Sequence, residues 1–412
     1  MATHARSAQR RRLDRRHGPS LAWPVVGAVV FAAGLGVLVD RVVAPQLAPS
    51  RESAFQRVLN GLVSGPHRIA PGVTAYLAGP HGVLIGSAGV EDAETGAPMP
   101  NNARVRLNSV GKMWTATLIL KLAGEGKMRL TDTVAHWLPG LLPYGNQITV
   151  LQLMSMTSGM IDTNDFYARP AYYISRIKNP TLRAIVLAAG RRARTDPAYP
   201  TTREWIDAAA GVGLLYEPGS TYHYSNIGYM VAGLIAAEAG GADLATQFRQ
   251  QIIDPLHLTS ARYDPAPNIT GPHAHGYSIS PKGKLTDATT WTSGLAANGG
   301  IVSDAADEAH FLQALVRGEI LKPAELTALE TPWSVADDYG LGVVIQPDGC
   351  ATPGTAYGHN GGGGGYQSSV QVSTDGSRVA VVLINGYPTS VAAQDHENTV
   401  LFNTMQTLYC GG

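Results

Sequence analysis

Three stretches in the middle of the chain place apolar residues at the three- and four-residue spacing of an α-helix. They are residues 109–123, 227–239 and 305–316, and prolines and glycines punctuate the segments between them. A fourth helical stretch, residues 391–409, closes the chain. The pattern therefore predicts a mostly helical middle and a C-terminal helix.

Strand-like runs lie toward the two ends of the chain. Residues 72–90 contain two apolar runs around the turn Gly79-Pro80-His81-Gly82, which is typical of a hairpin. Further runs follow at 339–345, 367–373 and 378–384. Strands at both ends with helices between them predict an α/β fold in which both chain termini build one sheet and the helices form an insertion.

The N-terminal region differs from the rest in both charge and hydropathy. A basic segment, residues 1–20, precedes the uncharged apolar stretch 21–39, which as a helix would span roughly 28 Å, close to the ~30 Å hydrocarbon core of a bilayer. We predict a single-pass cell-membrane anchor at 21–39 with its basic end cytoplasmic, a linker at 40–54 and an extracellular domain at 55–412. A cleaved signal and a secreted protein are the alternative.

Composition excludes two classes of protein. The chain has 412 residues, 44% hydrophobic and 15% charged, which argues against disorder. Its 31 basic residues balance 31 acidic ones, so it lacks the cationic surplus of a nucleic-acid binder. An extracellular location permits a disulfide between the two cysteines, Cys350 and Cys410, and a pair of buried free thiols is the alternative.

Several catalytic motifs are absent from the sequence. It contains no G-x-S-x-G, no H-E-x-x-H, no Walker phosphate loop and no strand-borne G-x-G-x-x-G. His273 and His275 lie in a loop without further candidate ligands, so a plain loop is favoured over a metal site there.

The sequence Ser109-Val110-Gly111-Lys112 is the first candidate for chemistry. Three residues are nearly one helical turn, so the lysine amine can reach the serine hydroxyl and act as its base. At a helix start, the dipole favours a developing oxyanion and, with partial burial, lowers the pKa of the lysine. The alternative is an N-cap serine with a solvated lysine. A second match, Ser175 to Lys178, runs into Pro180, which interrupts a helix.

Two further triplets follow in order, Tyr224-Ser225-Asn226 and His359-Asn360-Gly361. Taken singly, Tyr224 would be a packed aromatic and His359 a loop histidine. Together with Ser109 and Lys112, the ordered set favours a catalytic site.

With these motifs the chain resembles the serine penicillin-recognising family, which includes class C β-lactamases, D-alanyl-D-alanine carboxypeptidases and related esterases. The likeness covers about residues 55–412 and is greatest to exported carboxypeptidases. It implies a β-lactamase/transpeptidase-like fold with an antiparallel sheet flanked by helices, and a serine hydrolase domain. The segments that carry it, besides the three motifs, are ITVLQLMSMTSGM (148–160), 217–240, PHAHGY (272–277), 296–315 and YGLG (339–342).

The resemblance also implies a role for each motif residue. Ser109 is the acylated nucleophile, Lys112 its base and Tyr224 the proton relay to the leaving group. Asn226 holds Lys112 and the substrate amide. β-Lactams are then expected covalent ligands, and Cys350 pairs with Cys410. The resemblance implies no metal and no organic cofactor.

The third motif supplies the other wall of the expected cleft. By the same resemblance, His359 and Asn360 lie on the strand at the edge of the cleft, and Gly361 lets that strand approach the acyl group closely. The N–H of Gly362 pairs with that of Ser109 as the oxyanion hole.

The sequence departs from the family where a substrate carboxylate would bind. Relatives carry hydroxyls in the third motif and an arginine after YGLG, whereas this chain reads HNGG and Val343-Val344-Ile345. Between Lys322 and Arg378, His359 is the only basic side chain. Arginines from the helical region could substitute: Arg169, Arg176, Arg203 or Arg262.

Three functions follow from these observations. The first is an exported D-alanyl-D-alanine carboxypeptidase that acts on peptidoglycan stem peptides through an acyl-enzyme. The second uses the same machinery on esters, or on amides without a free carboxylate. The third is a non-catalytic binder of penicillins or muropeptides, against which the complete Ser109, Lys112 and Tyr224 set argues.

Overall fold

The computed structural model describes residues 50–65, 68–192, 200–292, 295–333, 338–350 and 354–411, with backbone only at 189–192. The predicted basic segment and membrane anchor, residues 1–39, lie outside the described residues. Within the described part of the chain, no single helix is long and apolar enough to cross a membrane, although one pair of helices bent by 75° meets the length and composition criteria together.

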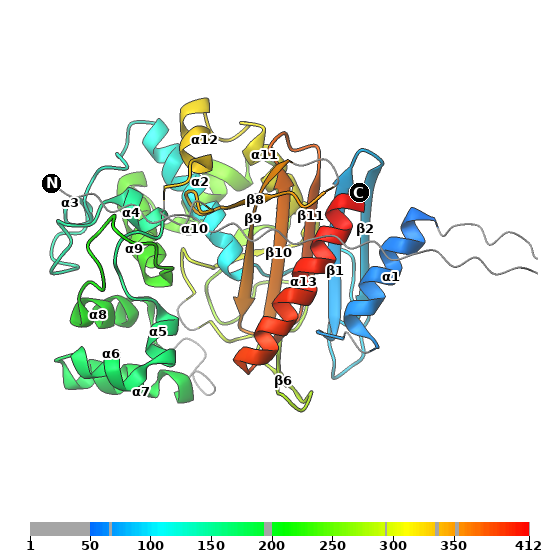
Figure 1. Ribbon diagram of the computed structural model, residues 1–412, viewed down its shortest axis with the longest axis horizontal. Helices are drawn as coiled ribbons and strands as arrows, with labels where there is room; N and C mark the ends of the chain where they lie inside the picture. Colours follow the sequence, from blue (N-terminus) through cyan, green and yellow to red (C-terminus); the bar gives the residue numbers. More distant parts are fainter. Residues whose placement is uncertain are drawn as a thin grey trace, which may run out of the picture. The chain divides into compact units, whose positions relative to one another are not determined.

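A six-stranded antiparallel sheet forms the centre of the compact unit Pro49–Gly412 (Figure 1). Its strand order is β2-β1-β11-β10-β9-β8, and β1 pairs with β11 in the register Tyr76↔Val381. Both ends of the chain therefore build one sheet, as predicted. The bounds are β1 Gly72–Gly79, β2 Gly82–Gly89, β8 Val344–Pro347, β9 Thr355–Gly363, β10 Tyr366–Ser373 and β11 Val379–Ile384.

Strand β11 shows how the sheet separates two cores. Ala380, Val382 and Ile384 pack toward α1 (Arg51–Val63) and α13 (Val391–Gly411), which covers the central strands in Figure 1. Val379, Val381 and Leu383 alternate with them and face the larger core, which includes α2 (Gly111–Gly124) and α11 (Ala305–Val316). This alternation follows from the two-residue period of a strand. Helix α1 begins within the segment 40–54 that we interpret as a linker.

The predicted helical middle is confirmed. Helices α2 (Gly111–Gly124) and α9 (Asn226–Gly240) are buried on nearly all sides, as expected for apolar helices at the centre of a domain. The other helices are α3 Val134–Trp137, α4 Val150–Met154, α5 Thr163–Ala168, α6 Pro170–Arg176, α7 Pro180–Arg192, α8 Thr202–Val212, α10 Leu244–Phe248, the π-helical turn Arg249–Ile253, α11 Ala305–Val316 and α12 Pro323–Glu330.

Two three-stranded sheets were not predicted, because their strands have only two or three residues each. One has the order β12-β5-β6 and the other β3-β7-β4. Their strands are β3 Val105–Arg106, β4 Arg262–Tyr263, β5 Tyr277–Ile279, β6 Leu285–Asp287, β7 Ile301–Ser303 and β12 Gly386–Pro388.

The predicted strand at 339–345 is wrong in its position, because β8 begins only at Val344. Gly342 has φ +76°, and a Cβ there would lie 2.7 Å from the Lys112 carbonyl oxygen, so the chain turns at this point against α2.

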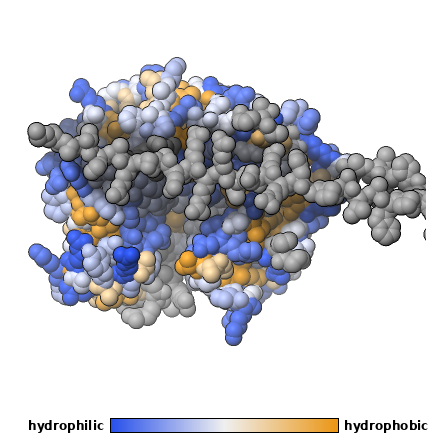
Figure 2. Space-filling model, viewed as in Figure 1, coloured by the Kyte–Doolittle hydropathy of each residue, from blue (hydrophilic) through white to orange (hydrophobic). Residues whose placement is uncertain are grey.

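The disulfide Cys350–Cys410 is present and joins the β8–β9 connection to the end of α13. On the face shown in Figure 2, apolar areas are interrupted by hydrophilic residues.

Candidate active site

Ser109 lies in a 3₁₀ turn, Asn108–Val110, that leads directly into α2. The preceding residue, Asn108, has φ +51°, an uncommon value for a residue with a side chain. Its amide Nδ2 donates to the carbonyl oxygens of Gly363 at 3.1 Å and Tyr366 at 3.3 Å. Asn108, which the sequence motifs do not indicate, thus fixes the start of the nucleophile helix against the β9–β10 hairpin.

Lys112 is fully buried and makes three hydrogen bonds. Its Nζ donates to Ser109 Oγ at 3.1 Å, to Asn226 Oδ1 at 2.7 Å and to the Asn298 carbonyl oxygen at 3.0 Å. Burial lowers the pKa of Lys112 to about 7, against the raising effect of the Asp162 carboxylate. A neutral amine that can accept the serine proton is therefore accessible near neutral pH.

Tyr224 completes the group around the serine. Lys112 Nζ lies 4.8 Å from the centroid of its ring. Burial raises the pKa of Tyr224 well above its ordinary value, and a hydrogen bond with Ser109 works in the opposite direction. Tyr224 therefore keeps its proton at neutral pH, which suits a phenol that donates to a leaving group.

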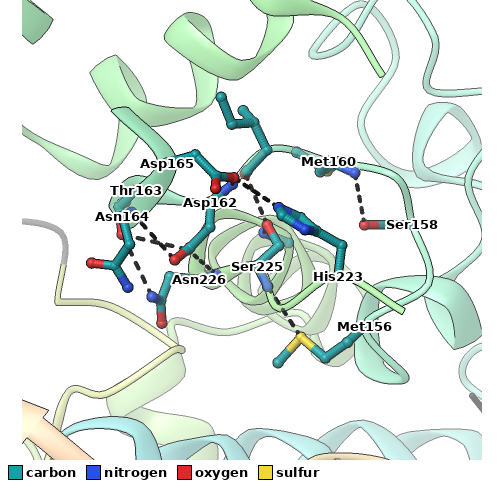
Figure 3. A network of polar contacts seen from close by, with 12 residues as sticks. Met156, Ser158, Met160, Asp162, Thr163, Asn164, Asp165, His223, Ser225 and Asn226 are labelled. Atoms are coloured by element: carbon teal, nitrogen blue, oxygen red, sulfur yellow. Dashed lines mark hydrogen bonds and ion pairs between the residues drawn. The ribbon is translucent and has the colours of Figure 1, made fainter. Parts of the chain in front are cut away.

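The segment 154–162 positions the loop that carries Tyr224 (Figure 3). The N–H of His223 donates to the Met156 carbonyl oxygen at 2.7 Å, and the N–H of Ser225 donates to Met156 Sδ at 3.3 Å. Within this segment Gly159 has φ +73°, and a Cβ there would lie 2.3 Å from the Tyr216 carbonyl oxygen. Gly159, which ends the sequence Thr157-Ser158-Gly159, is thus required by a close backbone approach.

The His359 side chain does not lie where a substrate-binding cation is expected. It is 7% exposed, its Nδ1 donates to the Asn360 carbonyl oxygen at 2.6 Å, and its Nε2 accepts from the Tyr339 hydroxyl at 3.3 Å. Burial, together with the positive charge of Lys112, lowers the pKa of His359 to about 3. The imidazole is therefore neutral at physiological pH.

Asn360 points to the opposite face of β9 from His359. Its Oδ1 accepts from Ser369 Oγ at 2.7 Å, and Ser369 in turn contacts Met405 of α13. Neither the Asn360 nor the His359 side chain lines the cavity at Ser109.

The backbone of β9 approaches the nucleophile closely. A Cβ at Gly361 would lie 2.1 Å from the Leu107 carbonyl oxygen and 3.0 Å from Ser109 N, so only glycine fits. Gly362 lines the same cavity as Ser109. This arrangement brings two backbone segments to one point, as an oxyanion hole requires.

The cavity at Ser109 has a volume of about 280 Å³. None of the described residues that line it carries a charged side chain. None of the four candidate arginines lines it; Arg203 pairs with Asp207 at 2.9 Å and Arg262 with Asp264 at 3.4 Å. The lining comprises Asn108, Ser109, Thr163, Asn164, Tyr167, Trp205, Tyr224, Asn226, Trp291, Leu295, Asn298, Gly362, Gly363, Gly364 and Tyr387.

Two other features of the sequence are not part of this cavity. The second Ser-x-x-Lys serine, Ser175, donates its hydroxyl to the Tyr172 carbonyl oxygen at 2.8 Å. In the described ranges no group of three or more His, Cys, Asp or Glu side chains could hold a metal ion, and His275 pairs with Asp287.

The sequence model of the β-lactamase family matches residues 39–403, and the chain belongs to this family of serine hydrolases. Penicillin-binding protein 4* of Bacillus subtilis (strain 168) is 24% identical over 306 residues, which span 70% of this chain and 62% of that protein. A protein of Escherichia coli (strain K12), provisionally named a D-alanyl-D-alanine carboxypeptidase, is 25% identical over 335 residues, 73% of each chain.

Solved structures support the same fold. A D-stereospecific amidohydrolase from Streptomyces sp. superimposes with a TM-score of 0.69 at 25% identity, covering 88% of this chain and 99% of that one. A D-amino acid amidase from Ochrobactrum anthropi SV3 gives a TM-score of 0.65 at 23% identity, covering 85% and 98%. The predicted β-lactamase-like fold is therefore confirmed.

Proposed function

We propose that the protein is a serine hydrolase that forms an acyl-enzyme on Ser109. The observation that carries the proposal is the contact of 3.1 Å between Ser109 Oγ and a buried Lys112 whose pKa is lowered to about 7. A hydroxyl becomes a useful nucleophile at neutral pH only when such a base lies within hydrogen-bond reach.

The proposed reaction has two steps. Neutral Lys112 takes the Ser109 proton as Oγ attacks the substrate carbonyl, and the N–H groups of Ser109 and Gly362 stabilise the oxyanion. Tyr224 gives its proton to the leaving group and recovers one from Lys112. Water then attacks the acyl-enzyme, the same groups return the proton to Ser109, and the acid product leaves.

We propose that the preferred substrate is a peptide-type amide or an ester that carries no free carboxylate in the cleft. Among the described residues the cavity has no charged lining, and His359, the one basic candidate on β9, is neutral. The names of the structural neighbours, an amidohydrolase and an amidase, agree with such a substrate. A carboxypeptidase that acts on stem peptides is the second candidate, which the Escherichia coli relative's name favours.

Paired substrates test this choice. A charge-assisted contact to a carboxylate is worth roughly 1.5 to 3 kcal/mol, so a dedicated carboxypeptidase would lose about ten- to a hundredfold in kcat/KM on the C-terminal amide of an acyl-D-Ala-D-Ala substrate. We expect a loss below about tenfold, because no cation lines the described cavity. A larger preference for the free acid would support the carboxypeptidase instead.

A cation introduced into the cavity sharpens the test. Asn164 is exposed and lines the cavity, so Asn164→Arg should raise kcat/KM on the free acid relative to the amide. The matched variant Asn164→Gln adds length without charge and should keep the wild-type ratio.

We also propose that residues 21–39 anchor the protein in the cell membrane with the hydrolase domain outside, secretion being the alternative. The disulfide Cys350–Cys410 supports an oxidising compartment. Fractionation of the full chain should recover it with membranes, and protease added to intact cells should digest it. Protection of the folded domain from that protease would contradict an external location.

A further inference from the structure

Asp162 is a buried carboxylate that the sequence motifs do not indicate. It is 4% exposed and lies at the N-cap of α5, where its Oδ2 accepts from Asn164 N at 3.3 Å. Its Oδ1 accepts from the backbone N–H of Asn226, the first residue of α9, at 2.7 Å (Figure 3). One carboxylate therefore satisfies N–H donors at the start of two helices, a position that favours negative charge.

Asn226 connects Asp162 to the base. The backbone of Asn226 is held by Asp162, and its side-chain Oδ1 accepts from Lys112 Nζ at 2.7 Å and from Asn298 Nδ2 at 3.4 Å. The side chain of Thr163, next to Asp162, accepts from Asn226 Nδ2 at 3.5 Å. Moving the carboxylate would therefore move the oxygen that orients the Lys112 amine.

The charge of Asp162 also acts on Lys112 directly, in the direction that raises the pKa of the lysine. The other titratable groups that face Lys112 are neutral near pH 7: burial raises the pKa of the phenols and lowers that of the imidazole. They are Tyr224, Tyr229 and His359, with Tyr222 and Tyr339 behind them. On the other side of Asp162, Asp165 of α5 is paired with His223 at 2.7 Å.

We propose that Asp162 is a positioning residue of the acyl-transfer site, which orients Asn226 and supplies the negative charge that acts on the buried Lys112 amine. The inference rests on the proposed function, because it assigns Lys112 the role of base. Asp162 does not touch the substrate in this assignment; it acts through Asn226 and through its field.

The sign of the charge effect makes the proposal testable. The acid limb of the rate profile reports the pH at which Lys112 loses its proton. Without the charge of Asp162 the protonated lysine is less stable, so its pKa falls and the neutral base persists to lower pH. Damage to the structure alone would lower the rate without moving the limb in this direction.

The experiment measures the second-order rate of Ser109 labelling by a fluorescent phosphonate between pH 5 and 9. Asp162→Asn should label about tenfold or more slowly at the plateau, because the Asn226 contact is weakened, while its acid limb moves by about half a unit or more to lower pH. Asp162→Ser, which keeps an N-cap oxygen but no charge, should show the same displacement. Asp162→Glu, which keeps the charge, should restore the wild-type limb.

Asp165→Asn is the matched control. It removes a charge from the same capping box and disturbs His223, but it leaves the Asp162 contact to Asn226 in place. Its acid limb should coincide with that of the wild type.

The outcomes separate the inference from the proposed function. A wild type that does not label at Ser109 would contradict the proposed function. If the wild type labels but the uncharged Asp162 variants label slowly with an unshifted acid limb, the inference is overturned. It is also overturned if the acid limb moves in Asp165→Asn and not in Asp162→Asn. Thermal melting of each variant shows whether it is folded. If Asp162→Asn is unfolded, the acid limb of Asp162→Ser tests the inference instead.

Discussion

At the scale of single residues, the chemistry depends on Lys112 being buried beside Ser109. Three hydrogen bonds fix the amine, and burial makes its neutral form accessible near pH 7. A serine and lysine three residues apart are common in proteins, and it is burial that distinguishes this pair from Ser175 and Lys178.

The first prediction concerns the nucleophile and its base. A fluorescent penicillin or phosphonate should label the wild type and not Ser109→Ala, and Lys112→Ala should label at least about a hundredfold more slowly because the hydroxyl loses its base. Ser175→Ala is the matched control and should label normally, since its hydroxyl is bonded to a helix carbonyl. If gel fluorescence shows that Ser109→Ala labels at the rate of the wild type, Ser109 is not the nucleophile.

The second prediction concerns pH. The active form contains neutral Lys112, so the rate of acylation should rise with pH through a midpoint near 7, as the pKa of Lys112 is about 7. His359, with a pKa of about 3, is already neutral in this range and contributes no step. The profile of His359→Gln should therefore keep the same midpoint. If the midpoint near pH 7 disappears in His359→Gln, the titrating group is the imidazole of His359 and not the Lys112 amine.

At the scale of elements, the site forms where the 3₁₀ turn before α2 meets β9. The third prediction tests that contact through Gly361→Ala. The added methyl would overlap the Leu107 carbonyl oxygen and press on Ser109 N, so β9 must move away from the nucleophile. We expect a loss of acylation rate of about a hundredfold, comparable to the loss of an oxyanion donor.

The control for this variant is another glycine with no such neighbour. A Cβ at Gly61, in the last turn of α1, would meet no atom within 4 Å. Gly61→Ala should keep full labelling and stabilise the protein by up to about 1 kcal/mol, because alanine restricts the unfolded chain. Equal labelling of both alanine variants would show that β9 does not need its close approach.

The elements also show what sequence patterns can and cannot predict. Periodicity located α9, α11 and α13 within a few residues, because each has a buried face that the pattern records. The β8 strand was misplaced because the turn at Gly342 depends on contact with α2, which is distant in sequence.

The same limit applies to the site. The family resemblance assigned Ser109, Lys112, Tyr224 and Asn226 to one site, and the structure brings these residues together. Only the contact between Ser109 and Lys112 is local in sequence and follows from helix spacing. The orientation of His359 depends on its burial beside Tyr339, and the roles of Asn108 and Asp162 depend on long-range hydrogen bonds. No single stretch of sequence records these contacts.

At the scale of the whole molecule, α2 is joined to α11 through a buried acid. Glu308 is fully buried; its Oε2 accepts from Trp114 Nε1 at 3.0 Å, and its Oε1 has no hydrogen-bond partner among the described residues. Trp114 also stacks on Phe311 of α11, with ring centroids 4.0 Å apart. Burial raises the pKa of Glu308 from 4.5 to about 8, so the folded protein holds this carboxyl in its neutral form at pH 7.

This raised pKa links global stability to pH. Between about pH 4.5 and 8 the folded state binds a proton at Glu308 that the unfolded state has released, so the contribution of this group to the free energy of unfolding falls as pH rises through that window. Each pH unit in the window corresponds to about 1.4 kcal/mol. Glu308→Gln keeps an acceptor for Trp114 and cannot ionise, and it removes this dependence.

The last prediction is therefore a Tm difference that grows with pH. Scanning calorimetry of Glu308→Gln and wild type at pH 5.5, 7 and 8.5 should show that the Tm of the variant rises relative to the Tm of the wild type at each step. The reason is that only the wild type must keep a proton on a buried carboxyl. The matched control is Glu319→Gln, which removes a carboxyl at an exposed position just after α11, and the change of the Tm difference with pH should be larger for Glu308→Gln than for this control. A constant difference for Glu308→Gln would mean that the core accommodates the carboxylate ion, and that the contact between α2 and α11 does not depend on a neutral acid.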